Sequence, residues 1–188
     1  MVVRYALLGL LCAAPAIAAN KAAVSNPEMA AIFKADQADR STYPIDWKVV
    51  GAADEKRRAR TEQLLDAGSL KTGQDFYDAA FVFQHGHTAN DYLKAHLLAM
   101  VAIARGQPDA PWIAAATLDR YLNAIGKPQV LGTQFTRVDG GKFTQEPYDR
   151  TLASDAMRKA LQVPPLAEQE AERQAYEAQA ANAGKKAK

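Results

Sequence analysis

The stretch TGQDFYDAAFVFQHGHTANDYLKAHLLAMVAIARG, residues 72–106, decides the fold. Thr72 and Thr88 each stand three residues before an aspartate, which is the spacing of a helix-capping box, and apolar residues at helical spacing follow both. Gly86 and Gly106 offer the two C-terminal stops. We therefore predict two helices joined by a short turn. Such a pair resembles one unit of a tetratricopeptide-type solenoid, but the chain has no self-similarity at the roughly 34-residue period of that fold.

Further helices are predicted on both sides of this hairpin, because caps, prolines and glycines punctuate apolar residues at helical spacing. They are a helix starting at Asn26-Pro27, one over about 52–67, one from Pro111 to Gly126 and a short one over 154–161. A loop that holds Trp47 is expected to separate the first two. The predicted fold class is mainly α, a single multi-helical domain of packed antiparallel helices.

The pattern changes late in the chain. Asp139-Gly140-Gly141 lies between β-prone residues, which predicts a short late β-hairpin. From 167 to 188 the sequence is rich in Ala, Glu and Gln and has few apolar anchors. We expect this segment to be a polar tail, helical or disordered, that lies outside the core.

The first residues have the pattern of a secretory signal peptide. Arg4 precedes an apolar run, and small-residue cleavage patterns end at Ala16 and Ala18. The run is shorter than the ~20 residues that span a bilayer, so a membrane anchor is disfavoured. We expect cleavage near Ala18 and a periplasmic or secreted protein. The predicted division is a signal peptide at 1–18, a helical domain at 19–166 and the polar tail at 167–188.

Cleavage would also remove Cys12, the only cysteine, and one basic residue, Arg4. A chain without thiols excludes disulfides, cysteine nucleophiles and thiolate metal sites. The 23 Lys and Arg residues would become 22, against 21 Asp and Glu. A nearly neutral chain gives no electrostatic reason to expect nucleic acid or an anionic membrane as a partner, and no stable membrane insertion is expected after cleavage.

Polar residues stand where the predicted helices and their joints should be apolar. Buried polar groups are costly unless they are paired, so this placement indicates either a structural hydrogen-bond network or a site. The residues concerned are Asp36, Arg40, Gln84, His85, Asp119, Arg120, Gln129 and Gln134. We predict that they converge in space and line one pocket.

His85 is the strongest catalytic candidate. It stands at a predicted helix C-terminus, where the helix dipole favours the protonated ring, and Gly86 leaves its approach open. As a general acid or base it would need a carboxylate partner, and Asp36 or Asp119 could supply one. The alternative is a capping histidine whose ring bonds the last carbonyl groups of the helix.

The remaining candidates suit ligand binding. The forked guanidinium groups of Arg40 and Arg120 suit carboxylates or phosphates. The amides of Gln84, Gln129 and Gln134 offer both donors and acceptors, which suits sugar, peptide or amide ligands. The alternative is that these groups tie helices to the loop after Gly126 and satisfy its backbone.

A metal site is considered because His85, His87, Asp91 and His96 would lie within one helix–turn–helix. The chain has no paired-histidine motif on a single helix face and no adjacent glutamate in the zincin arrangement. We therefore expect neither a metal nor another cofactor.

The polar motifs together resemble a bacterial family catalogued as domain of unknown function 6624. The matching motifs are Asp36-Gln37 with Asp39-Arg40, Gln84-His85-Gly86, Asp119-Arg120, and Pro128-Gln129 with Gly132-Thr133-Gln134. The family usually has an aromatic residue where Leu131 stands here. The resemblance implies a mainly helical domain with a shared polar cluster, and it implies no particular activity.

Three functions are compatible with these residues. The first is a hydrolase-like acid/base enzyme that uses His85 with Asp36 or Asp119. The second is a non-catalytic module that binds a small molecule or a peptide. The third is a scaffold whose polar residues only lock the fold. A histidine that contacts a carboxylate and opens on a cleft would favour the enzyme.

Overall fold

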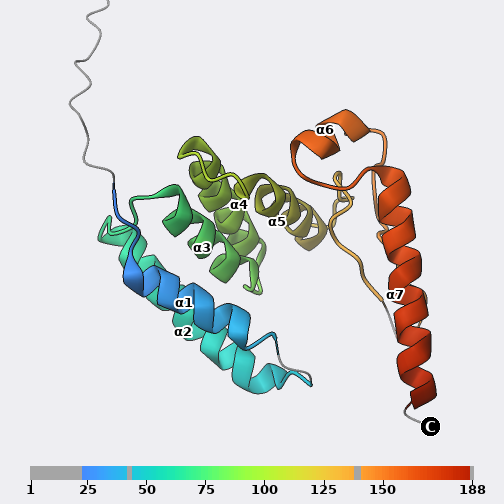
Figure 1. Ribbon diagram of the computed structural model, residues 1–188, viewed down its shortest axis with the longest axis horizontal. Helices are drawn as coiled ribbons and strands as arrows, with labels where there is room; N and C mark the ends of the chain where they lie inside the picture. The colour runs from blue at the N-terminus through green and yellow to red at the C-terminus, as the bar shows by residue number, and fades with distance from the viewer. Residues whose placement is uncertain (1–22, 42–43, 138–140, 187–188) are drawn as a thin grey trace, which may run out of the picture.

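The computed structural model describes residues 23–41, 44–137 and 141–186, and this part of the chain is mainly helical, as predicted (Figure 1). Its helices are α1 (Pro27–Ala38), α2 (Trp47–Asp66), α3 (Gly73–Gln84), α4 (Ala89–Ala104), α5 (Ala110–Ala124), α6 (Asp155–Ala160) and α7 (Leu166–Lys186). None of these helices combines the length and the apolar character that a membrane span requires. The predicted signal peptide lies outside the described residues.

The α3–α4 hairpin forms because both predicted capping boxes are present. Asp75 N donates to Thr72 Oγ1 at 3.1 Å, and Thr72 N donates to the Asp75 carboxylate at 2.9 Å. Asp91 makes the same reciprocal bonds with Thr88 at the start of α4. A Cβ at Gly86 would lie only 2.5 Å from Asp91 Cγ, so the turn can approach this cap only with a glycine.

The main core lies where α4 packs between α3 and α5, while α1 and α2 cover α3 (Figure 1). Small side chains let these helix backbones approach closely. The buried alanines of this core are Ala79, Ala80, Ala95, Ala99, Ala102, Ala110 and Ala114. Larger side chains such as Met29, Phe83 and Ile113 fill the remaining space. A smaller cluster around Leu131 and Val163 lies under the loops that follow α5.

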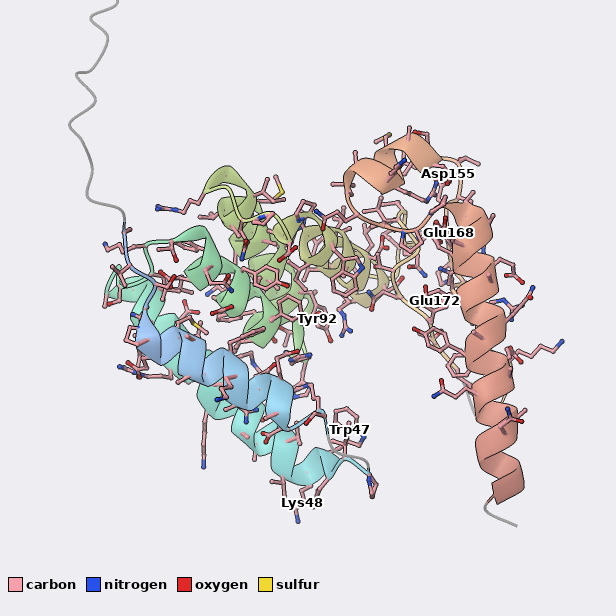
Figure 2. The ribbon with its side chains drawn as sticks, in the orientation of Figure 1. Trp47, Lys48, Tyr92, Asp155, Glu168 and Glu172 are labelled. Carbon is pink, nitrogen blue, oxygen red and sulfur yellow. The ribbon has the colours of Figure 1, made fainter. Side chains whose placement is uncertain are left out.

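Helix α2 begins earlier than the expected position near 52. Asp46 is its N-cap and accepts from Lys48 N at 3.1 Å and from Val49 N at 3.2 Å. Trp47 is therefore the first residue of the helix and not part of a loop. Figure 2 shows Trp47 at the end of α2 that lies beside the C-terminal end of α1.

The late β-hairpin is not confirmed. One antiparallel bridge joins Thr136 to Thr144, with both N–H···O distances at 2.8 Å, and residues 138–140 of the expected turn lie outside the described residues. The backbone of Phe143 bonds to side chains of α7 and not to a partner strand. Its N–H donates to Glu177 at 2.7 Å, and its carbonyl accepts from Arg173 at 3.3 Å.

The segment expected to be a polar tail is helix α7, and its first turns belong to the folded core. Gln169 is only 2% exposed and donates to Leu131 O at 2.9 Å. Further along α7, the Tyr176 ring packs against Phe135 and Phe143, with centroid distances of 5.2 and 5.6 Å. The expectation of a tail outside the core was wrong because amide hydrogen bonds, rather than aliphatic side chains, anchor this helix.

Candidate functional site

A network of arginines and aspartates joins α1 to α2. Arg40 Nη1 donates to Asp36 Oδ1 at 3.1 Å, and Arg40 Nη2 donates to Asp54 Oδ2 at 2.5 Å. Arg57 Nη1 donates to the other oxygen of Asp54 at 2.9 Å and also pairs with Asp39. Asp36 and Asp54 are buried, so these contacts are what compensates their charges.

This network fixes the ring of His85. The Nδ1 atom of His85 lies 3.0 Å from Asp36 Oδ1. A carboxylate can only accept, so Nδ1–H donates and the lone pair of the neutral ring is on Nε2. Asp36 is held in turn by Arg40 and by Gln37 Nε2, which donates at 2.8 Å. Arg58 Nη1 donates to the His85 carbonyl oxygen at 2.9 Å and holds the backbone at the α3 C-cap.

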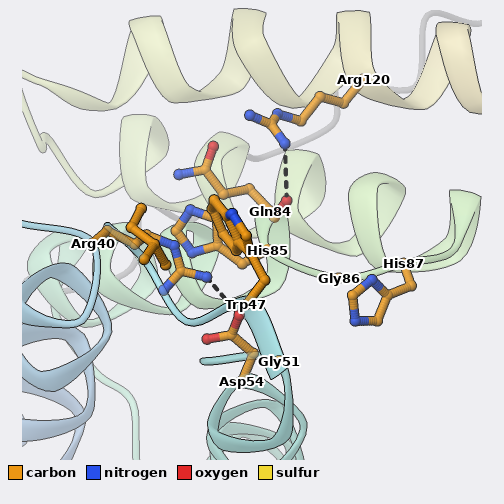
Figure 3. Close-up of a pocket in the computed structure, with 10 residues that line it drawn as sticks. Arg40, Trp47, Gly51, Asp54, Gln84, His85, Gly86, His87 and Arg120 are labelled. Carbon is orange, nitrogen blue, oxygen red and sulfur yellow. Dashed lines mark hydrogen bonds and ion pairs between the residues drawn. The ribbon is translucent and has the colours of Figure 1, made fainter. Parts of the chain in front are cut away.

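His85 opens on a pocket of about 440 Å³ between the start of α2, the α3–α4 turn and α5 (Figure 3). We call it the central pocket. Its lining residues are Arg40, Ile45, Trp47, Gly51, Asp54, Gln84, His85, Gly86, His87 and Arg120. The His85 side chain is 16% exposed, whereas Asp36 behind it is fully buried. The indole of Trp47 lies at the rim and is largely exposed. A Cβ on Gly51 would meet no atom within 4 Å, so α2 leaves open space there.

Two more predicted residues bring polar groups to the central pocket. The Gln84 side-chain amide makes no hydrogen bond with any other described residue. Arg120 reaches over from α5, and its Nη1 donates to Gln84 O at 3.5 Å (Figure 3). Burial lowers the pKa of Arg120 below its ordinary value, the Tyr92 phenol acts in the opposite direction, and the like charge of Arg40 lowers it further.

Asp119 lies elsewhere and is not the partner of His85. Its Oδ1 accepts from Val130 N at 2.8 Å and from Leu131 N at 3.1 Å. Its Oδ2 accepts from Thr133 N at 2.9 Å and from Thr133 Oγ1 at 2.8 Å. This fully buried carboxylate is thus saturated by the loop after α5, which is the structural alternative considered from the sequence.

The side chains of the two predicted glutamines of this loop also form hydrogen bonds with backbone groups. Gln129 is 1% exposed; it donates to Gln134 O at 2.9 Å and to Gln145 O, and it accepts from Gln134 N at 3.0 Å. The Gln134 side chain donates to Ala116 O at 3.2 Å and to Thr133 Oγ1 at 3.0 Å. Gln134 also lines a second cavity.

A second cavity of about 480 Å³ adjoins the central pocket, because His87 and Arg120 line both. We call it the adjoining hollow. Its lining residues are His87, Ala89, Tyr92, Arg120, Asn123, Ala124, Gln134 and Thr136. The structure therefore brings together Asp36, Arg40, Gln84, His85 and Arg120, places Gln134 at the adjoining hollow, and leaves Asp119 and Gln129 in the loop network.

Sequence analysis missed Asp54 and Arg57, which complete the network behind His85. Both belong to the face of α2 that also carries Val50, Thr61 and Leu64, at spacings of three and four residues. That helical spacing is a signal that could have singled out Asp54 as a carboxylate on a buried face.

Three of the four residues considered for a metal, His85, Asp91 and His96, have other partners. Asp91 caps α4, and His96 Nδ1 bonds to Ala114 O at 2.9 Å. In the described ranges no group of three or more His, Cys, Asp or Glu side chains is arranged to hold a metal ion. No residue is assigned to a cofactor.

Comparisons with protein-family models, with curated proteins and with solved structures gave no match. The resemblance to domain of unknown function 6624 stays a prediction from the sequence motifs.

Proposed function

We propose that the central pocket is the active site of a hydrolase-like acid/base enzyme in which His85 is the catalytic base and Asp36 positions it. The contact of 3.0 Å between His85 Nδ1 and Asp36 Oδ1 carries this proposal, because it directs the basic Nε2 away from the buried network. A carboxylate–imidazole pair of this kind holds the ring in one tautomer and stabilises the imidazolium that forms during proton transfer.

Water is the nucleophile that fits this pocket best. None of its described lining residues carries a hydroxyl or thiol group. The remaining carboxylate there, Asp54, is occupied by Arg40 and Arg57. A general base beside a pocket without a side-chain nucleophile suits direct attack by water.

In the proposed reaction, His85 Nε2 removes a proton from water while the water oxygen bonds to the carbonyl carbon of an ester or amide. The carbonyl electron pair moves to its oxygen, where the free Gln84 amide N–H can donate a hydrogen bond. When this pair returns, the bond to the leaving group breaks, and the imidazolium gives its proton to that group. Arg40 and Asp36 keep the ring in place throughout.

The first experiment assays the purified protein against a panel of chromogenic acyl esters and N-acyl anilides. His85→Gln should lower kcat by a factor of about 100 or more, which is the usual contribution of a general base. The matched control is His96→Gln, since this ring bonds to a backbone carbonyl outside the central pocket and should leave kcat unchanged. Full activity in His85→Gln would contradict the proposal.

A second pair of variants tests the location of the site without touching the buried charges. Gly51→Leu places a side chain in the open space of the central pocket and should raise KM, whereas Gly51→Ala should leave KM close to wild type. Ring ¹⁵N shifts of neutral His85 should report a proton on Nδ1. Saturable binding without turnover of any ester or amide would instead favour the non-catalytic binding module.

We further propose, from the pattern of residues 1–18, that the protein acts after export, in the periplasm or outside the cell. A fusion of residues 1–22 to a reporter that is active only after export tests this part. Retention of the reporter in the cytoplasm would contradict it.

A further inference from the structure

Arg120 lies at the junction of the two cavities. It lines both the central pocket and the adjoining hollow, so a ligand that extends from one to the other passes its guanidinium. In Figure 3 this group extends from α5 toward Gln84 and the pocket. A group on a substrate that reacts at His85 could therefore reach Arg120 from the same pocket.

The charge of Arg120 is not compensated by the rest of the described chain. Its one hydrogen bond goes to the Gln84 carbonyl oxygen at 3.5 Å, and its Nε is enclosed without an acceptor. By contrast, Arg40 and Arg57 each contact two carboxylates. A desolvated guanidinium without a counterion is costly to the fold, and an oxyanion would relieve that cost.

A second unpaired atom lies near Arg120. Asn123 Oδ1 is enclosed without a donor in the described chain, and Asn123 lines the adjoining hollow. The Gln134 amide nitrogen is used for Ala116 O and Thr133 Oγ1, so the Gln134 oxygen is the part left for a ligand. These two oxygens can accept from hydroxyl or N–H groups. The adjoining hollow therefore suits the donor-bearing part of a molecule whose oxyanion is at Arg120.

We propose that Arg120 binds the carboxylate of a small substrate that spans both cavities, with its hydroxyl or N–H groups at Asn123 and Gln134. This inference rests on the proposed function for the position of the reacting bond at His85. A singly charged carboxylate matches Arg120, which among the described arginines lining the two cavities is the one without a carboxylate partner. A phosphate dianion would bring a second charge toward Asp54, which faces the same pocket.

The experiment measures binding by two-dimensional NMR titration of the purified protein. The probes are N-acetylalanine, its uncharged N-methylamide, acetate and inorganic phosphate, each up to millimolar concentration. N-acetylalanine should perturb the Arg120 Nε–H resonance and bind at least about tenfold more tightly than its N-methylamide, a difference of about 1.4 kcal/mol. Equal binding of acid and amide, binding of no carboxylate, or tighter binding of phosphate would overturn the proposal.

Variants separate this inference from the proposed function. Arg120→Met should abolish the preference for N-acetylalanine over its N-methylamide. Arg120→Lys keeps the positive charge but lacks the forked guanidinium, so it should retain part of this preference. Arg60→Gln is the matched control, because Arg60 is exposed and pairs with Glu28 outside both cavities. His85→Gln should bind N-acetylalanine normally even though turnover is lost. Binding that depends on Arg120 in a protein without hydrolytic activity would refute the proposed enzyme and keep the carboxylate site.

A stability measurement guards against a variant that merely misfolds. If the partly buried guanidinium is uncompensated, Arg120→Met should leave the thermal midpoint equal to or above that of the wild type. A large fall in the midpoint would mean that Arg120 has a structural counterpart, and it would overturn the proposal.

Discussion

Gly132 provides the sharpest test of how the loop after α5 is held. It has φ of +82°, and a Cβ there would lie 2.5 Å from Tyr148 Oη and would overlap Gln169 Oε1. That amide oxygen accepts from Tyr148 Oη and from Gln145 Nε2, both at 3.1 Å. Gly132→Ala must therefore displace a buried acceptor that two donors share.

The magnitude follows from a comparison with Gly126, which has φ of +70° but where an added Cβ would meet no atom within 4 Å. Both substitutions carry a left-handed backbone cost of about 1 kcal/mol, partly offset by the smaller entropy of the unfolded chain. Gly126→Ala should therefore lower the free energy of unfolding by no more than about 1 kcal/mol. Gly132→Ala additionally leaves two buried donors unpaired, at about 1–3 kcal/mol each, and should cost about 3–7 kcal/mol in all.

Urea unfolding followed by far-ultraviolet circular dichroism measures the free energy of unfolding of both variants. The dependence of this free energy on urea concentration should be the same in the two. If Gly132→Ala and Gly126→Ala lose the same stability within about 0.5 kcal/mol, the amide network around Gln169 does not hold the loop. In that case α7 would be attached to the domain mainly by the aromatic contacts of Tyr176 and by the bonds of Arg173 and Glu177 to the Phe143 backbone.

Three further predictions concern buried groups. Burial raises the pKa of Asp78 from 3.8 to about 6, so the contribution of Asp78 to stability is complete below about pH 4 and is lost as the pH rises through 6. Asp78→Asn should therefore raise the free energy of unfolding, measured in urea titrations, by about 2–3 kcal/mol at pH 8 and by little at pH 4. Asp119→Asn turns one carboxylate acceptor into an amide donor that faces two donors, so it should lower the free energy of unfolding by about 2–4 kcal/mol. It should also reduce the protection of the backbone amides of residues 130, 131 and 133 from hydrogen exchange, and unchanged protection would contradict this prediction. His85→Ala removes one of several bonds to Asp36 and should lower the free energy of unfolding by less than about 2 kcal/mol. Phe83→Ala in the core should lower it by about 3–5 kcal/mol in the same denaturant assay. Equal losses of stability in the two variants would make His85 a core residue.

The helices could be predicted from the sequence because their signals are local. A capping aspartate, a proline at the first turn or a glycine stop acts on residues within one helical turn. The start of α2 was placed too late because Trp47 was assigned to a loop, although Asp46 directly before it is an N-cap. The late hairpin is not confirmed: one antiparallel bridge joins Thr136 to Thr144, and residues 138–140 of the expected turn lie outside the described residues.

The site was predictable only in part, because its members come from four helices. Asp36 and Arg40 are one helical turn apart, so their proximity is fixed by the sequence. The choice between Asp36 and Asp119 as the partner of His85 depends on how α1 packs against α3, which no local pattern specifies. Both aspartates looked alike as charged residues on apolar faces, and the structure gives them opposite surroundings.

That difference distinguishes the structural network around Asp119 from the proposed functional one around His85. Asp119 and Gln169 use their hydrogen-bonding capacity on the fold itself. At the central pocket, by contrast, part of the hydrogen-bonding capacity is unused by the described chain. His85 has a free ring nitrogen, Gln84 has a free side-chain amide, and Arg120 has an enclosed Nε without an acceptor. A residue that only locked the fold would have no reason to keep such groups unpaired, since each one costs stability. His85, Gln84 and Arg120 line the same central pocket, and the proposed ligand would supply the partners that the described chain does not.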